Sequence, residues 1–250
     1  MTTLRASLRL GCSMLHALHG VSICALVFPF VDETARMRWV GWWSRRMLGL
    51  MGITLHANGE PSPAPALLLA NHVSWLDILA IDAVHPARFV SKADVRHWPV
   101  LGFLVARGGT LFIERERRRD ALRVVHQVAA ALKEGATVAV FPEGTTSHGP
   151  TLLPFHANLL QAAITVGAPV QPVVLRFSDR SSTFSAAAAY VGETTLVRSL
   201  WQVACADSLE AHVTFLPPLS TLAVERRSLA AVVRAQIQSA LDSRSASDAP

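Results

Sequence analysis

Three short apolar runs, each followed within three residues by a polar side chain, constrain the fold of this chain more than any other sequence feature. They cover residues 66–70, 109–113 and 137–140. Apolar runs of this length between turn residues are typical of buried strands. In α/β folds, functional side chains gather at the carboxyl ends of such strands. The sequence therefore predicts an α/β domain, and the polar residues after the runs are candidates for a functional site.

The polar residues after the first run include a possible acid–base pair. His72 and Asp77 lie five positions apart, where residues 66–70 give way to the apolar, helix-compatible segment 74–84. A carboxylate that accepts a hydrogen bond from one imidazole nitrogen fixes the tautomer and leaves the other nitrogen free to take a proton. The same residues also fit an ordinary helix start, with Ser74 as N-cap and Asp77 in the first turn. Residues 71–77 alone do not decide between these interpretations.

Four blocks in order strengthen the catalytic interpretation. They are Asn-His-x4-Asp at 71–77, Phe-Ile-Glu-Arg at 112–115, Phe-Pro-Glu-Gly-Thr at 141–145 and Ala-Pro-Val-Gln-Pro-Val-Val at 168–174. Together they resemble the glycerolipid acyltransferase family, which includes the lysophosphatidic acid acyltransferases. The resemblance covers the middle of the chain, residues 67–177, and the order of the blocks is far more specific than any single block.

The resemblance implies a mechanism and a set of site residues. His72 would act as general base on a free hydroxyl of the acceptor, and Asp77 would orient the imidazole and stabilise the imidazolium. The activated hydroxyl would attack the thioester carbon of acyl-CoA or of acyl-carrier protein, so no protein nucleophile is needed. We therefore expect an O-acyltransferase with no metal and no cofactor beyond this co-substrate. The predicted substrate-binding residues are Asn71, Ser74, Arg115, Glu143, Gly144 and Thr145.

The choice of acceptor stays open because the chain departs from the family pattern. Arg115 would contact an anionic headgroup, because its planar fork grips phosphate well. However, Glu114 replaces the commoner Asp, Thr146 stands where many members carry Arg, and His156 replaces a Lys. The first expectation is 1-acyl-glycerol-3-phosphate as acceptor, giving phosphatidic acid. The alternatives are another lysolipid such as lyso-ornithine lipid or, on the same fold, a lipid hydrolase or lipid-binding protein.

Composition and the N-terminal region predict a membrane-bound protein. Hydrophobic residues make up 51% of the chain and charged residues 16%, with a formal net charge of +5. A basic, apolar protein is suited to bind an anionic membrane surface or an anionic substrate. Nucleic acid is disfavoured as a partner, because the Lys and Arg residues do not surround an aromatic platform of a recognisable nucleic-acid-binding module. Arg5 and Arg9 precede an apolar stretch of roughly 20 residues, enough to cross or enter a bilayer. Tryptophans and arginines are then interleaved over residues 36–46, as in amphipathic helices that lie at headgroup level.

These observations define the expected organisation. Residues 1–51 would form two membrane-anchoring helices, residues 52–242 an acyltransferase domain with a mixed central sheet flanked by helices, and residues 243–250 a disordered tail. His16 and His19 within the first helix fit a polar stripe better than a metal site. A cleaved signal peptide is disfavoured because no small-residue cleavage site follows the apolar run. The arginines before that run predict an active site facing the cytoplasm at the inner membrane.

Overall fold

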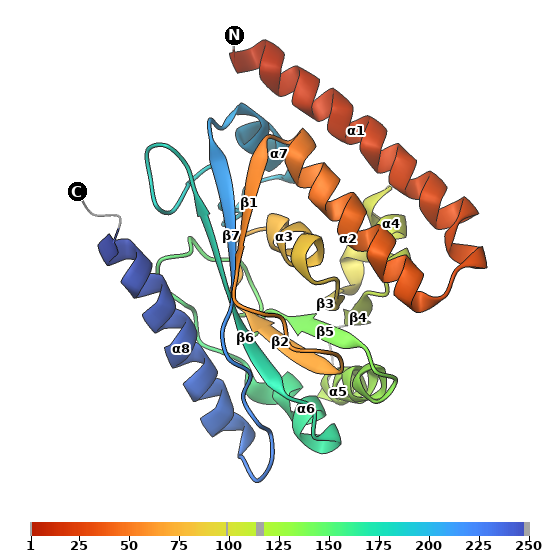
Figure 1. Ribbon diagram of the computed structural model, residues 1–250, viewed down its shortest axis with the longest axis vertical. Coiled ribbons are helices and arrows are strands. Elements are labelled where there is room, and N and C mark those ends of the chain that lie inside the picture. Colours follow the sequence, from red (N-terminus) through yellow and green to blue (C-terminus); the bar gives the residue numbers. More distant parts are fainter. Residues whose placement is uncertain (1, 99, 114–117, 248–250) are drawn as a thin grey trace.

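A seven-stranded mixed sheet with helices on both faces forms the centre of the molecule (Figure 1). The computed structural model describes residues 2–98, 100–113 and 118–247. All neighbouring strands are parallel except the antiparallel pair β6 and β7. Across the sheet the strands are β1 (Ile53–Asn58), β7 (Leu209–Phe215), β6 (Val170–Ser178), β2 (Ala66–Ala70), β5 (Thr137–Val140), β3 (Arg88–Lys92) and β4 (Leu111–Ile113). The predicted α/β fold with a mixed sheet is confirmed.

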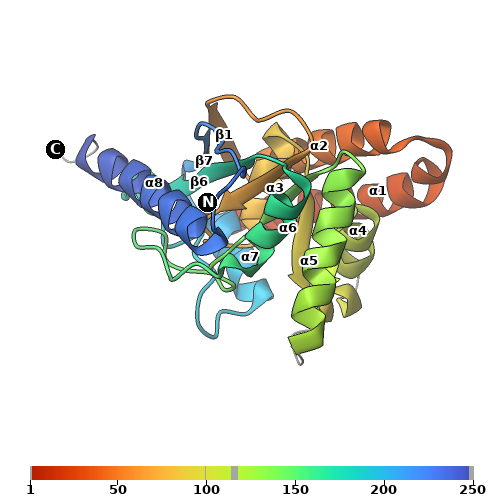
Figure 2. The same cartoon turned by 90° about the horizontal axis from the view of Figure 1, so that it is seen from below.

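Strand β2 shows why a continuous apolar run is required at the centre of this sheet. Its side chains alternate between the two faces, and every residue of the strand is fully buried. Leu67 and Leu69 join a core with α5 (Arg118–Lys133), α6 (Leu160–Val166) and α8 (Arg226–Ser247). Leu68 and Ala70 join the opposite core with α2 (Glu33–Leu50), α3 (Leu76–Val84) and α7 (Leu196–Cys205). Figure 2 shows these helices around the sheet from a second direction.

The long helix α1 (Thr2–Leu26) lies against the rest of the protein and is not isolated from it (Figure 1). Arg9 donates from Nη1 to the carbonyl oxygens of Ala204 and Ala206 at 3.0 and 2.9 Å, at the end of α7. Further along α1, Nε2 of His16 lies 3.1 Å from the Trp43 carbonyl oxygen, and the Trp43 indole donates back to the His16 carbonyl at 3.0 Å. The histidine therefore joins α1 to α2. Among the described residues, Thr3–Phe30 is the one helical segment long and apolar enough to cross a membrane.

The remaining elements are short. They are η1 (Phe28–Phe30), η2 (Ala93–His97), α4 (Leu101–Arg107) and η3 (Ala157–Leu159).

Helix α8 continues to Ser247, so it enters the segment 243–250 that the sequence predicted to be disordered. Residues 242–247 contain no Gly or Pro, and extending an existing helix costs far less than starting one.

Candidate active site

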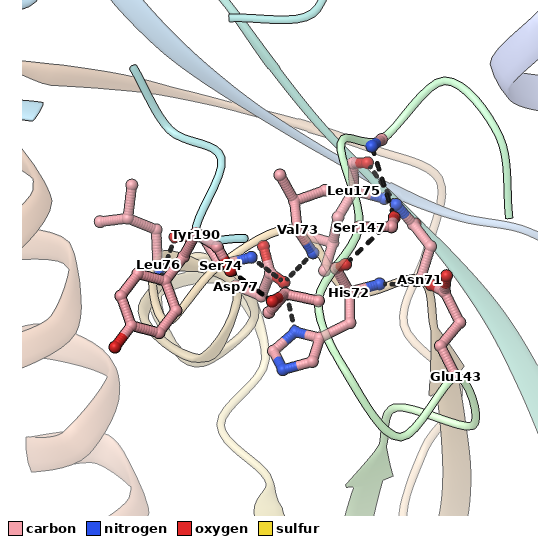
Figure 3. Close-up of polar contacts among 12 residues, drawn as sticks. Asn71, His72, Val73, Ser74, Leu76, Asp77, Glu143, Ser147, Leu175 and Tyr190 are labelled. Atoms are coloured by element: carbon pink, nitrogen blue, oxygen red, sulfur yellow. Dashed lines mark hydrogen bonds and ion pairs between the residues drawn. The ribbon is translucent and has the colours of Figure 1, made fainter. Parts of the chain in front are cut away.

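The carboxyl end of β2 places a histidine against a buried carboxylate (Figure 3). The chain leaves β2 at Ala70, and Asp77 lies in the first turn of α3. Nδ1 of His72 is 2.7 Å from Oδ2 of Asp77. The Asp77 side chain is fully buried, whereas that of His72 is 19% exposed. Because an ionised carboxylate only accepts, Nδ1 carries the hydrogen and Nε2 is the basic nitrogen; the described residues provide no hydrogen-bond partner for Nε2.

The helix start and the acid–base pair are one structure. Oδ2 of Asp77 also accepts from the backbone N–H groups of Val73 and Ser74 at 2.7 and 2.9 Å. The Ser74 hydroxyl in turn accepts from the N–H of Leu76 at 3.0 Å. This exchange between a serine and an acid three residues later resembles a capping box. Capping the helix therefore fixes the carboxylate in the position where it meets the imidazole.

An aromatic ring from the neighbouring strand holds the imidazole in place. Phe141 follows β5, and its ring stacks on that of His72 with centroids 3.9 Å apart and an interplanar angle of 10°. Phe89 on β3 stacks behind Phe141 at a centroid distance of 6.0 Å. The imidazole is therefore constrained in its plane by Phe141 and at one nitrogen by Asp77. The sequence analysis gave no role to Phe141, although its place before Pro142-Glu143 marks it as part of a conspicuous block.

Glu143 ties the third sequence block to the backbone of the first. One carboxylate oxygen accepts from the N–H of His72 at 2.8 Å, and the other accepts from the N–H of Leu153 at 2.9 Å. Ser147 then donates its backbone N–H to the His72 carbonyl at 2.7 Å. Burial raises the pKa of the Glu143 carboxyl, opposed by the two N–H donors. In this structure the Glu143 carboxylate accepts hydrogen bonds from backbone N–H groups. Its predicted contact with substrate stays a prediction.

The other predicted substrate-binding residues differ in accessibility. Asn71 is fully buried, and its side-chain amide exchanges two hydrogen bonds with the backbone of Leu175 at 2.8 and 2.7 Å, which joins the end of β2 to β6. Ser74 is also fully buried. Gly144 has φ of 72°, a conformation that suits glycine, and Thr145 is exposed beside it. Arg115, with Glu114, lies outside the described residues.

A loop that the sequence analysis left without a role is hydrogen-bonded to this region. The Tyr190 backbone N–H donates to the Val73 carbonyl at 3.1 Å, and the Thr146 hydroxyl donates to the Tyr190 carbonyl. Thr146 therefore fastens the loop of residues 179–195 to the site. The loop is rich in Ser and Ala, and no local pattern in the sequence identifies its partner.

Comparisons with known proteins agree on one family. The model of the family described as Acyltransferase matches residues 53–176. The lyso-ornithine lipid O-acyltransferase of Pseudomonas aeruginosa is 34% identical over 214 residues, which are 85% of this chain and 82% of that protein. The 1-acyl-sn-glycerol-3-phosphate acyltransferase of Neisseria meningitidis is 40% identical over 175 residues, 69% of this chain and 68% of the relative. The crystal structure of the 1-acyl-sn-glycerophosphate acyltransferase PlsC from Thermotoga maritima shares the fold, with a TM-score of 0.68 at 19% identity, covering 94% of this chain and 97% of that one.

Proposed function

We propose, since this chain belongs to the acyltransferase family, that it transfers a fatty acyl group from an acyl thioester to the free hydroxyl of a lysolipid. The observation that carries the proposal is the His72–Asp77 pair, with Nε2 of the imidazole turned away from the carboxylate. Nε2 takes the hydroxyl proton as the oxygen attacks the thioester carbonyl carbon. The tetrahedral intermediate then collapses, the C–S bond breaks, and the thiol leaves with the proton returned by the imidazolium. Asp77 stabilises the positive charge on the ring between these steps.

The acceptor that we propose first is 1-acyl-glycerol-3-phosphate, with phosphatidic acid as the product. The relative from Neisseria meningitidis is named for this acceptor. Thr146 favours a second acceptor, lyso-ornithine lipid, because it occupies a position where the family often carries Arg and so removes one cationic contact. Its hydroxyl donates a hydrogen bond to the Tyr190 carbonyl oxygen. The relative from Pseudomonas aeruginosa is named for that lipid. In either case the attacking group is a free hydroxyl of the lysolipid, so the proposed chemistry at His72 is the same for both acceptors.

We further propose that α1 and α2 lie in the membrane interface, with the active site on the cytoplasmic side of the inner membrane. Leu4, Leu8, Leu15 and Leu26 form an outward stripe on α1 and are each more than 60% exposed. Exposed apolar area of this extent is a mark of a membrane or protein contact. The hydrogen bonds of Arg9 to the end of α7 hold the N-terminal half of α1 along the domain, which supports an orientation in the plane of the interface.

Thioester cleavage by the detergent-solubilised protein tests the function. Acyl-CoA would be offered alone, with 1-acyl-glycerol-3-phosphate and with lyso-ornithine lipid, with His72→Ala as the control. We expect CoA release that needs a lysolipid and is lost in the variant, and the lipid that supports release identifies the acceptor. Release without any acceptor would indicate a hydrolase instead. Undiminished acceptor-dependent release by His72→Ala would remove His72 from the mechanism.

A further inference from the structure

A second concave surface lies at the β4 edge of the sheet, away from the His72 site. It is an open groove with a volume of about 730 Å³, formed by β4, the turn η2 and the outer side of α5. Its lining includes three arginines, Arg88, Arg96 and Arg123, together with His97, and Glu134 is the one acidic residue among the described lining residues. We call this surface the β4 groove. A concave site with this charge attracts anionic ligands.

The cations of the β4 groove are not equally available to a ligand. Arg88 already forms ion pairs with Glu33 and, at 3.4 Å, with Glu134. In contrast, Arg96 and Arg123 are exposed and have no ion-pair partner within the described part of the chain. The Arg96 guanidinium lies 5.9 Å from the centroid of the Phe112 ring. Within the described residues the groove therefore offers two guanidinium groups without an ion-pair partner, one of them beside an aromatic ring, a combination that binds phosphate and can also stack against a purine.

Although the β4 groove is away from His72 along the sheet, Arg96 and Arg123 lie toward the carboxyl ends of the parallel strands, as His72 does. Arg96 follows the carboxyl end of β3, and α5 starts beyond the carboxyl end of β4, with Arg123 in its second turn. The order β2-β5-β3-β4 separates β2 from β4 by three strand spacings, or about 14 Å. A phosphopantetheine arm has about as many bonds along its chain as a peptide of four to five residues. At roughly 3.3–3.6 Å per residue of fully extended peptide, the arm spans roughly 13–18 Å. An acyl thioester at His72 could thus be carried by a phosphate anchored in the β4 groove.

We propose that the β4 groove binds the phosphate groups of coenzyme A while the pantetheine arm extends toward His72. This inference rests on the proposed function and specifies where the acyl donor is held. A concave groove beside an aromatic ring fits the nucleotide end of coenzyme A, with its three phosphates and its adenine. The phosphopantetheine of an acyl-carrier protein shares one of these phosphates and therefore becomes a separate arm of the test. Arg96 and Arg123 are the ligand-binding residues.

Donor kinetics with and without phosphates test the assignment. Arg96→Ala, Arg123→Ala and the double variant would be compared with wild type and with Arg227→Ala, which removes an exposed cation from α8. Each groove substitution should raise the KM for acyl-CoA about tenfold, because a charge-assisted contact to phosphate is lost, and should leave kcat and the KM for the lysolipid unchanged. With S-acyl pantetheine, which has no phosphate, all proteins should perform alike. Arg96→Lys should restore part of the affinity.

The outcomes separate this proposal from the proposed function. An unchanged KM for acyl-CoA in the double variant would overturn the β4 groove assignment and leave the acyltransferase assignment intact. A raised KM for the lysolipid alone would assign the groove to the acceptor headgroup, and an effect confined to acyl-carrier protein would assign it to that donor; either result overturns the proposal. If wild type transferred no acyl group from any donor, the proposed function would fall. Even in that case, calorimetry would test the groove through the binding of free CoA. Weaker binding to the double variant than to Arg227→Ala would support the β4 groove as the site that binds the CoA phosphates.

Discussion

At the residue scale, one carboxylate oxygen organises the proposed catalytic centre. Oδ2 of Asp77 accepts from the His72 ring and from the backbone N–H groups of Val73 and Ser74. The other oxygen, Oδ1, is buried, and no described residue donates to it. No cationic side chain among the described residues pairs with this carboxylate, apart from the His72 ring when it is protonated. Asp77 is therefore placed to stabilise the imidazolium that forms when His72 takes a proton.

Replacing this carboxylate should reduce the chemical step more than substrate binding. We expect Asp77→Asn to lower kcat by roughly 10²–10⁴-fold with little change in either KM, because the negative charge is lost and the amide cannot fix the required tautomer. Steady-state acyl transfer, with circular dichroism to confirm folding, is the measurement. The double variant with His72→Ala should be no worse than His72→Ala alone, since the two residues act as a unit. Nearly full activity of Asp77→Asn would contradict this role.

The sequence was informative about residues in local contact and uninformative about distant partners. The spacing of His72 and Asp77 in one strand–helix junction indicated that the two side chains could meet. The contact of Glu143 with the His72 N–H joins positions 71 residues apart, and the Phe141 ring reaches His72 only because β5 is adjacent to β2. Such contacts depend on strand order, which local hydrophobic patterns do not determine.

At the element scale, α3 buries a second carboxyl group whose ionisation opposes folding. Asp82 is 6% exposed, and one of its oxygens accepts from the Ala87 N–H at 3.0 Å. Desolvation raises the pKa of Asp82 to about 8, compared with about 3.9 in an unfolded chain. Because the folded pKa is the higher one, this group favours folding below about pH 4, and that contribution is lost as the pH rises to about 8.

Asp82→Asn should therefore stabilise the protein increasingly as the pH rises. The amide keeps an acceptor for the Ala87 N–H and cannot ionise, which at pH 7 removes a cost of up to about 4 kcal/mol. Melting temperatures in detergent between pH 5 and pH 8 provide the measurement, with Asp94→Asn as an exposed control. The advantage of Asp82→Asn over wild type should be larger at pH 8 than at pH 5. A difference that is constant over this range would show that Asp82 does not titrate as described.

The exposed stripe of α1 leads to a prediction about membrane attachment. Leu8 and Leu15 lie two turns apart on this stripe, and burying each leucine in lipid is worth about 1.5–3 kcal/mol. The double variant Leu8→Glu, Leu15→Glu should therefore bind anionic vesicles at least about 100-fold more weakly than wild type. Co-sedimentation measures this binding, and Leu222→Glu, at a leucine that is 76% exposed in the loop before α8, provides the matched control. Equal loss in both proteins would show that α1 is not the contact surface.

At the scale of the whole molecule, the sequence predicted most elements but not how distant segments are joined. The apolar runs at residues 66–70 and 137–140 located β2 and β5 correctly. The sequence did not predict the place of β7, which lies between β1 and β6 and is parallel to β1 and antiparallel to β6. Strand periodicity specifies which side chains share a face and says nothing of which strand is the neighbour.

Gln171 shows how one side chain joins such segments, and it leads to the last prediction. This fully buried residue of β6 accepts from the Ser62 N–H at 2.7 Å and donates to the carbonyl oxygens of Glu60 and Leu216, both at 2.9 Å. Gln171→Ala leaves three backbone groups without this partner and should cost about 3 kcal/mol, which lowers the melting temperature by about 6–12 °C. Gln161→Ala, which removes only a local contact on α6, should shift it little. Similar melting temperatures for the two variants would mean that water or neighbouring groups replace the hydrogen bonds of the Gln171 amide, so that this side chain is not what holds β6 to the entry of β2 and the exit of β7.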